Sequence, residues 1–204
     1  MIKILIDMLQ VRAQLAALIM VLVVIPNGPT HGQETYMLID DFSDATLTSK
    51  LGTQWRGVSD QVMGGISNVT VTRGSEVDRH FLRLSGDVRL ENNGGFIQAA
   101  VDLTPTREYF DASGYSGIRL VVRGNGEQYS VHLRTPDNIR PWQSYRAQFI
   151  AGETLNIVDI PFSDFSAYRT EVPIDISKLL RIGIVAIGRA FQADLSIYEV
   201  GFYR

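Results

Sequence analysis

The chain has 204 residues, a formal charge of −3, no cysteine and three histidines, and its length predicts a single domain. The missing cysteine excludes disulfides, thiolate nucleophiles and cysteine-ligated zinc. The slightly acidic composition, without a visible run of basic residues, argues against binding of nucleic acid.

Residues 1–32 differ in composition from the rest of the chain. Lys3 and Arg12 precede an apolar run over residues 15–25, after which helix-breaking residues lead to Thr30-His31-Gly32. This order of a basic, an apolar and a small-residue region is typical of a secretory signal peptide. The eleven residues of the apolar run are too few to span a bilayer, which needs about 20.

We therefore expect residues 1–32 to be a signal peptide, with an uncleaved N-terminal anchor as the alternative, followed by a domain over residues 37–204. Cleavage would export the protein to the periplasm or the medium of a bacterium. An uncleaved segment would be its only contact with a membrane. If translation starts instead at Met37, the protein is cytoplasmic.

Short apolar segments recur at regular spacing in the rest of the chain, separated by Gly and Asp turns, which is typical of β-strands. The clearest is 81–90, where leucines alternate with polar residues as one face of a half-buried strand requires. The full series of expected strands is 37–42, 69–73, 81–90, 97–103, 118–123, 129–134, 145–150, 155–160, 182–187 and 195–202.

Two of these segments, 118–123 and 129–134, are joined by Gly124-Asn125-Gly126, which predicts a hairpin. Only residues 175–181 suggest a helical turn. A series of short strands without a helical period of useful length predicts an all-β fold, either an antiparallel β-sandwich or jelly roll or, as the alternative, a barrel that differs only in closure.

Two Gly-rich stretches interrupt the strand series. The first runs from Trp55 to Ser67 and the second from Glu91 to Phe96. Glycine permits backbone angles or close approaches that other residues do not, so we expect the two stretches to pack together at one edge of the sandwich, with Gly64 and Gly95 at the contact. Each stretch could be a structural loop or part of a ligand site. In the second case Asp60 would contact the ligand.

Few residues are arranged for catalysis or metal binding. His80 and His132 are expected on the solvated surface, and no spacing of ligands predicts zinc. No pair of carboxylates stands out as the kind that glycosidases use. We interpret Asp40, Asp41 and Asp44 as strand-end and turn residues rather than calcium ligands, and expect no metal and no cofactor.

Several motifs occur in the same order as in a known family. They are Trp55, Val58-Ser-Asp60, Val62-Met-Gly-Gly65, Ser67, Gly86, Leu90-Glu-Asn-Asn-Gly-Gly-Phe96, Tyr115, Arg123-Gly124, Gly126, Tyr129, Leu133-Arg134, Tyr145, Phe149, Ile160-Pro-Phe162 and Phe165. On these residues the chain from 39 to about 202 resembles the complex I intermediate-associated protein 30 family (NADH:ubiquinone oxidoreductase intermediate-associated protein 30 domain).

The resemblance implies a galactose-binding-like jelly roll, a fold shared with many carbohydrate-binding modules, and it carries over no catalytic residue. Mitochondrial members of the family assist assembly of the respiratory NADH:ubiquinone oxidoreductase by binding subassemblies. The chain departs from the family pattern at Leu155, where a Trp is usual, and at Arg189-Ala-Phe191, which replaces a Gly-Pro-Phe-like turn.

We predict a non-catalytic, chaperone-like binding domain that assists assembly of a membrane or respiratory complex through protein partners. The alternatives are an exported carbohydrate-binding module and, third, a hydrolase. The aromatic residues of the chain could stack on sugar rings or fill the core. The candidate binding residues are Trp55, Asp60, Met63, Gly64, Gly65, Ser67, Asn92, Asn93, Gly94, Gly95, Phe96, Arg123, Tyr129, Arg134, Trp142 and Tyr145.

Overall fold

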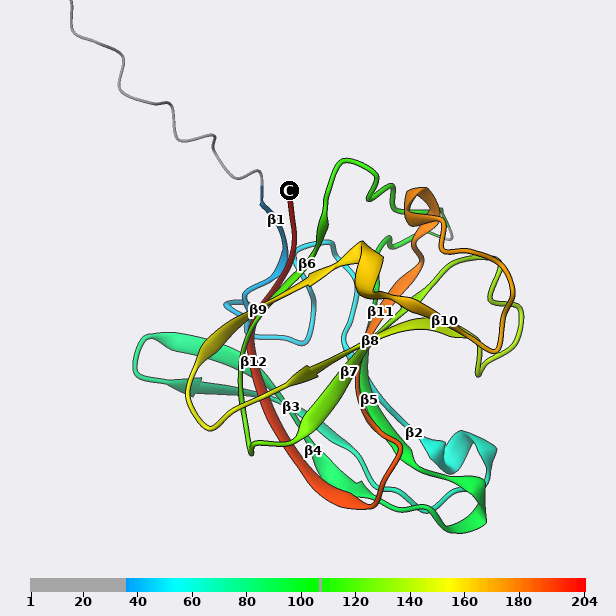
Figure 1. The fold of residues 1–204 in the computed structure, drawn as a ribbon. Coiled ribbons are helices and arrows are strands. Elements are labelled where there is room, and N and C mark those ends of the chain that lie inside the picture. The colour runs from blue at the N-terminus through cyan, green and yellow to red at the C-terminus, as the bar shows by residue number, and fades with distance from the viewer. Residues whose placement is uncertain (1–35, 107) are drawn as a thin grey trace, which may run out of the picture. The chain divides into compact units, whose positions relative to one another are not determined.

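The computed structural model describes residues 36–106 and 108–204, which form two antiparallel sheets stacked on one apolar core (Figure 1). The predicted all-β sandwich is confirmed. The expected signal peptide or anchor lies outside the described residues. Within the described ranges, no helix is long and apolar enough to cross a membrane.

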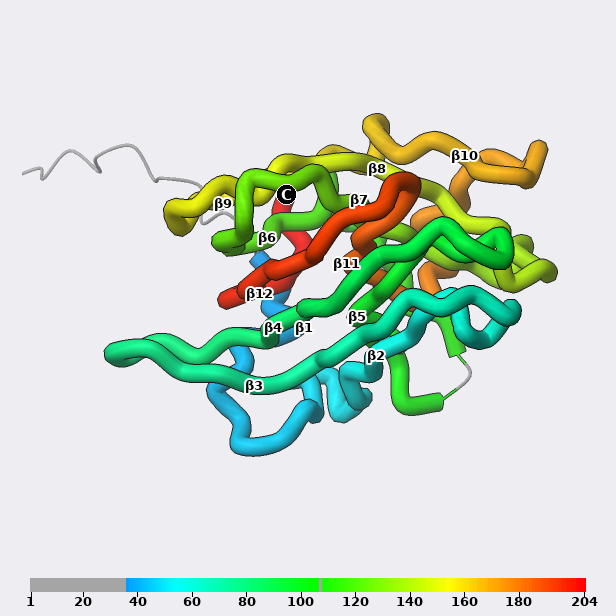
Figure 2. The backbone as a smooth tube through the Cα atoms, turned by 90° about the horizontal axis from the view of Figure 1, so that it is seen from below, coloured from blue at the N-terminus to red at the C-terminus, as the bar shows by residue number. Residues whose placement is uncertain are grey.

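The first sheet is organised by its longest strand, β12. β12 pairs with β4 along its first half and with β1 along its second half, and β6 pairs with its other side. The order is β3-β4-β12-β6-β9, and Figure 2 shows β3 and β4 as a hairpin that projects beyond β12. The strands are β1 Met37–Asp40, β3 Thr70–Glu76, β4 Arg79–Val88, β6 Gly117–Gly124, β9 Asn156–Pro161 and β12 Phe191–Tyr203.

The second sheet has the order β10-β8-β7-β11-β5-β2. The sequence pattern missed its two edge strands, because β2 has four residues, β10 has three, and neither shows apolar alternation. The strands are β2 Arg56–Ser59, β5 Phe96–Asp102, β7 Gln128–Arg134, β8 Ser144–Ile150, β10 Ser166–Tyr168 and β11 Arg181–Ile187. The short 3₁₀ turns are η1 Asp60–Met63, η2 Glu91–Asn93, η3 Phe162–Asp164 and η4 Ile176–Lys178.

The core lies between the sheets because alternate side chains of each strand point inward. Leu82 and Leu84 of β4 and Val131 and Leu133 of β7 are buried there. The residues between them point to the outer faces. The period-two pattern of the sequence therefore predicted the apolar face of β4.

The predicted hairpin of residues 118–123 with 129–134 is wrong. β6 belongs to the first sheet and β7 to the second, so Gly124-Asn125-Gly126 carries the chain from one sheet to the other. The amide of Gly124 donates to the carbonyl of Gly152 and that of Gly126 to the carbonyl of Ala151, both at 2.8 Å. A Cβ on Gly124 would lie 2.6 Å from that of Ala151, and Gly126 has φ of 82°. The two glycines thus serve a crossing between sheets.

Candidate functional site

The two Gly-rich stretches are joined by the carboxylate of Asp60. Its Oδ1 accepts from the amide of Ser67 at 2.9 Å, and its Oδ2 accepts from the Ser67 hydroxyl at 2.5 Å and from the amides of Gly95 at 2.6 Å and Phe96 at 3.3 Å. Asp60 is 0% exposed. The expected contact between the stretches is therefore present, and we call these bonds the Asp60 clasp.

The clasp leaves Asp60 no free oxygen to offer a ligand, which corrects its place among the candidate binding residues. Burial alone would raise the pKa of Asp60, but the hydrogen bonds from Ser67 and Gly95 outweigh it and hold the pKa below its ordinary value. The carboxylate is charged, and its charge is satisfied by amides of both loops.

The glycines of the clasp have different roles from those expected. Close approach occurs at Gly65 and Gly94, where a Cβ would lie 2.3 and 2.4 Å from the carboxylate of Asp60. Gly64 has φ of 90°, and no atom lies within 4 Å of the place a Cβ would take. Glycine is therefore needed here for the backbone angle that ends η1 and not for close packing. Gly95 has φ of 127°, and a Cβ there would lie 2.9 Å from the side chain of Leu90.

Three of the five aromatic residues among the candidate binding residues belong to the core. Trp55 donates its indole N–H to Asp40 at 2.8 Å, and the rings of Tyr129 and Tyr145 are buried with their hydroxyls hydrogen-bonded. This corrects their place among the candidate binding residues: Tyr129 and Tyr145 point inward from β7 and β8, and Trp55 packs into the core just before β2. Trp142 is 46% exposed and remains available.

The other predicted site residues are spread over the molecule. Met63 is exposed on η1, while Asn92 and Asn93 form η2 with positive φ. Arg123 lies on the outer face of the first sheet, where it pairs with Glu76. We name the exposed apolar side chains on the two clasped loops the clasp patch; they are Val62, Met63, Ile66 and Leu90.

A cluster of arginines that the sequence did not reveal lies on the outer face of the second sheet. Arg181 pairs in register with Arg134 of β7 and with Asp102 of β5. Arg146 of β8 pairs with His132, two residues before Arg134 on β7. Arg56 of β2 pairs with Ala100 on the same face. We define the arginine face as Arg56, Arg134, Arg146 and Arg181 together with Asp102 and the outward residues between them. These arginines come from four separate strands, so they form no run of basic residues in the sequence.

Asp102 neutralises two of the four arginines. Its carboxylate receives Arg56 at 3.0 Å and Arg181 at 2.6 Å. Burial would raise the pKa of Asp102, but the hydrogen bonds from the two guanidinium groups outweigh it, so the pKa is lowered. This end of the arginine face is therefore a three-residue ion-pair network.

Arg134 and Arg146 are held by neutral groups instead. Arg134 donates to the carbonyl of Asn138 at 2.7 Å, and Arg146 donates to the hydroxyl of Ser144 at 2.9 Å. Arg146 also lies 3.4 Å from the ring centre of Tyr168, a cation–π contact. Burial lowers the pKa of both guanidinium groups, and both stay charged at neutral pH.

Aromatic rings border this half of the arginine face. Tyr168 is on β10, the edge strand, and Trp142 lies in the loop before β8, where its carbonyl accepts from Arg146 at 3.4 Å. Both rings are partly exposed. Among the described residues, Arg134 and Arg146 therefore have no carboxylate partner; Arg146 stacks on the ring of Tyr168 and is bonded to the backbone of the exposed Trp142.

His132 lies at the centre of the same face and is not solvated as predicted. It is 8% exposed, and it pairs in register with Arg146 on one side and Gly183 on the other. Burial, with the charge of Arg146, lowers its pKa to about 3. Its Nε2 has no hydrogen-bond partner within the described part of the chain, an arrangement that costs about 1–3 kcal/mol.

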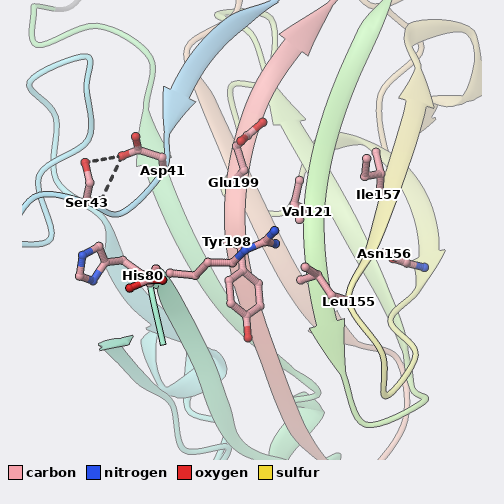
Figure 3. Close-up of a pocket in the computed structure, with 11 residues that line it drawn as sticks. Asp41, Ser43, His80, Val121, Leu155, Asn156, Ile157, Tyr198 and Glu199 are labelled. Carbon is pink, nitrogen blue, oxygen red and sulfur yellow. Dashed lines mark hydrogen bonds between the residues drawn. The ribbon is translucent and has the colours of Figure 1, made fainter. Parts of the chain in front are cut away.

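A cleft of about 610 Å³ indents the outer face of the opposite sheet (Figure 3). It forms on the side of β12 that faces β4 and β1, at a gap between the two: pairing with β4 ends at Ile197, and pairing with β1 starts at Val200. A β-bulge at this point places Tyr198 and Glu199 between the two.

One wall of this cleft is apolar and the other polar. Leu155 and Ile157 lie on one side, and Asp41 and Ser43 lie on the other (Figure 3). Asp41 is already engaged, because it accepts from Ser43 and pairs with Lys50 at 3.1 Å. The cleft and the arginine face are on opposite sheets, so cleft residues provide matched controls for substitutions on the arginine face.

No three His, Asp or Glu residues of ranges 36–106 and 108–204 are grouped to hold a metal ion. Asp40 receives the indole of Trp55 and the amide of Phe42. Asp41 and Asp44 accept from the residues two positions onward, Ser43 and Thr46. All three aspartates thus have structural partners at the end of β1.

A family model described as Complex I intermediate-associated protein 30 matches residues 41–197, which confirms the family resemblance. Among curated proteins, Endoglucanase 3 of Fibrobacter succinogenes is 25% identical over 167 residues. That match covers 74% of this chain and 24% of the endoglucanase, so the chain spans about a quarter of that relative's length.

Solved structures of carbohydrate-binding modules share the fold. The family 11 module of cellulase Lic26A-Cel5E of Clostridium thermocellum has a TM-score of 0.63 at 12% identity, covering 82% of this chain and 93% of the module. The family 30 module of cellulase Cel9D-Cel44B of the same organism has a TM-score of 0.58 at 14% identity, covering 80% and 95%. At these identities the likeness shows the fold alone.

Proposed function

The chain belongs to the complex I intermediate-associated protein 30 family, and we propose that it is a non-catalytic module that binds carbohydrate on its arginine face. The observation that carries the proposal is the half of this face where Arg134 and Arg146 have no carboxylate partner among the described residues, with the ring of Tyr168 stacked on Arg146 and the exposed Trp142 in the loop bonded to it.

These groups match the chemistry of a sugar. The ring of a sugar has hydroxyl groups at its edge and C–H groups on its faces. Planar guanidinium groups donate several hydrogen bonds in fixed directions, and aromatic faces pack against C–H groups. The fold shared with carbohydrate-binding modules and the match to part of an endoglucanase support the same proposal.

The charge of the face points to acidic sugars. Four arginines and one aspartate, Asp102, leave an excess of three positive charges among these five residues, although the whole chain has a formal charge of −3. A guanidinium group binds a carboxylate through two parallel hydrogen bonds. Polysaccharides that contain uronic acids are thus the ligands that the face fits best.

Calorimetric titration with oligogalacturonate, alginate and mixed-linkage β-glucan oligosaccharides tests the proposal. We expect the uronate ligands to bind more tightly than the neutral glucan and to weaken with added salt. Arg146→Gln and Trp142→Ala should each weaken binding about tenfold or more, by the loss of a charge-assisted bond or a packed ring. Ile157→Ser, in the opposite cleft, should bind like wild type. Absence of binding to every sugar, or equal loss in the Ile157 control, would contradict the proposal.

The module is proposed to be non-catalytic because its strongest candidates for proton transfer are unsuited to it. Asp60 is fully hydrogen-bonded in the clasp, and His132, with a pKa of about 3, is too weak a base at neutral pH. Prolonged incubation with the same polysaccharides should release no reducing ends. Turnover that tracks the purified protein, and disappears in a variant, would overturn this part.

A second candidate function is protein binding at the clasp patch. Val62 is 72% exposed and Met63 50% exposed on a loop that the clasp holds rigid, and exposed apolar groups of this kind mark protein interfaces. Such an interface suits the assembly role implied by the family description. Cross-linking to purified respiratory-complex subassemblies should then be lost in Val62→Ser/Met63→Ser and kept in Trp142→Ala. The opposite pattern would assign partner binding to the arginine face.

A further inference from the structure

His132 is an unusual residue for its position. It lies in the middle of the arginine face with 8% exposure, and its Nε2 is one of three buried side-chain atoms without a hydrogen-bond partner in the described residues. An apolar side chain would fill the same space without leaving a polar atom unpaired. Packing therefore does not explain a histidine here.

The residues level with His132 on the next two strands are small. Its register partner on β11 is Gly183, and the next strand has Ala100 at the same level. A Cβ at Gly183 would lie 2.5 Å from Nε2 of Gln98. The side chain of Gln98 thus rests over the glycine, and it is attached through flexible bonds that allow it to move aside.

Gln98 also has an unused amide. Its side chain forms no hydrogen bond within the portion of the chain that the structure describes, and it reaches Gly183 from β5 while His132 flanks Gly183 from β7. Two side chains able to accept and donate hydrogen bonds therefore border a floor made of Gly183 and Ala100.

We propose that His132 and Gln98 form a subsite on the arginine face that binds one hydroxyl group of the sugar ligand. This inference rests on the proposed carbohydrate-binding function. Gln98 moves off Gly183 as the ligand enters, the hydroxyl donates to Nε2 of His132, and its oxygen accepts from the Gln98 amide. The imidazole stays neutral at physiological pH, as its depressed pKa requires, and a neutral imidazole has one nitrogen free to accept.

The test compares binding with stability in His132→Leu and His132→Gln. We expect His132→Leu to bind the uronate oligosaccharide about tenfold more weakly, the value of one good hydrogen bond, while its urea midpoint equals or exceeds that of wild type. His132→Gln should regain part of the affinity, because its amide reaches a similar position. If the histidine were only structural, its replacement would lower the urea midpoint and leave the affinity of the folded protein for the oligosaccharide unchanged.

A ligand series locates the hydroxyl. Wild type should bind one monodeoxy derivative of the oligosaccharide about tenfold more weakly than the parent, and His132→Leu should not distinguish the two. In wild type the ¹⁵N resonance of the His132 imidazole should shift on addition of the parent sugar, a measurement that needs no variant to fold.

The outcomes separate this inference from the proposed function. If wild type binds sugar, and both the affinity of His132→Leu and the imidazole resonance are unchanged, the subsite is wrong and the arginine face stands. If wild type binds no sugar, both proposals fall. If His132→Leu does not fold, the imidazole shift and the deoxy series on wild type decide.

Discussion

Replacing Asp60 by asparagine should destabilise the domain by about 3 kcal/mol, estimated from the clasp bonds. The asparagine oxygen can keep the three bonds that Oδ2 now accepts from Ser67, Gly95 and Phe96, but without the negative charge these weaken. The asparagine NH₂ then faces the amide of Ser67, which loses its acceptor. One buried unpaired N–H costs about 1–3 kcal/mol, and three weakened bonds add a similar amount.

Urea unfolding followed by tryptophan fluorescence measures this loss, because Trp55 is buried and reports the packed state. Asp78→Asn is the matched control: Asp78 is exposed and forms no side-chain hydrogen bond in the described structure. We expect its stability to change by less than about 0.5 kcal/mol. A loss below about 1 kcal/mol in Asp60→Asn, or one equal to the control, would refute the clasp.

The same variant has an expected pH dependence. The pKa of Asp60 is lowered in the folded state, so its carboxylate stabilises the domain fully above the unfolded pKa and progressively less as the pH falls through the folded pKa. Asp60→Asn has no such group. Its disadvantage relative to wild type should therefore shrink toward acid pH.

Three further changes test other parts of the molecule. Below pH 6.5 wild type should lose stability relative to His132→Leu, by roughly 3 kcal/mol at pH 4. The reason is that the imidazole takes up a proton in the unfolded state, whereas in the folded state, with a pKa of about 3, it does not. Urea unfolding at several pH values checks the sign. Gly65→Ala should cost about 1–3 kcal/mol through a clash with the clasp carboxylate, whereas Gly152→Ala, in open space, should not, as thermal unfolding will show. Trp55→Phe removes the indole donor of buried Asp40 and should cost about 1–3 kcal/mol, read as a lower Tm.

Local patterns were sufficient for most of the fold. The strand 81–90 was predictable because one buried and one solvated face impose a period of two, and β4 has these faces at Leu82 and Leu84. The short edge strands β2 and β10 were missed, since neither has two apolar faces to alternate. Local patterns also could not show that β6 and β7 belong to different sheets, because a Gly-Asn-Gly turn is equally suited to a hairpin and to a crossing between sheets.

The candidate site was less predictable than the fold. Trp142 was a candidate binding residue and is exposed, but Trp55 and Tyr145 could not be recognised as core residues from local patterns. Arg134 was a candidate binding residue, but the other three arginines of the arginine face were not. His132 was expected in solvent because it alternates with apolar residues, and its burial depends on the fold around it, which the local pattern does not show.

The sequence by itself determined the all-β class, the family and the meeting of the two Gly-rich loops, because strand periodicity and glycine geometry act over a few neighbouring residues. Tertiary structure alone decided the roles of the polar groups. Asp60 became a clasp, and arginines from β2, β7, β8 and β11 became one face, because register brings together residues that are far apart in the chain. Burial and hydrogen bonding, which decide whether a polar side chain meets a ligand or holds the fold, arise from those distant contacts.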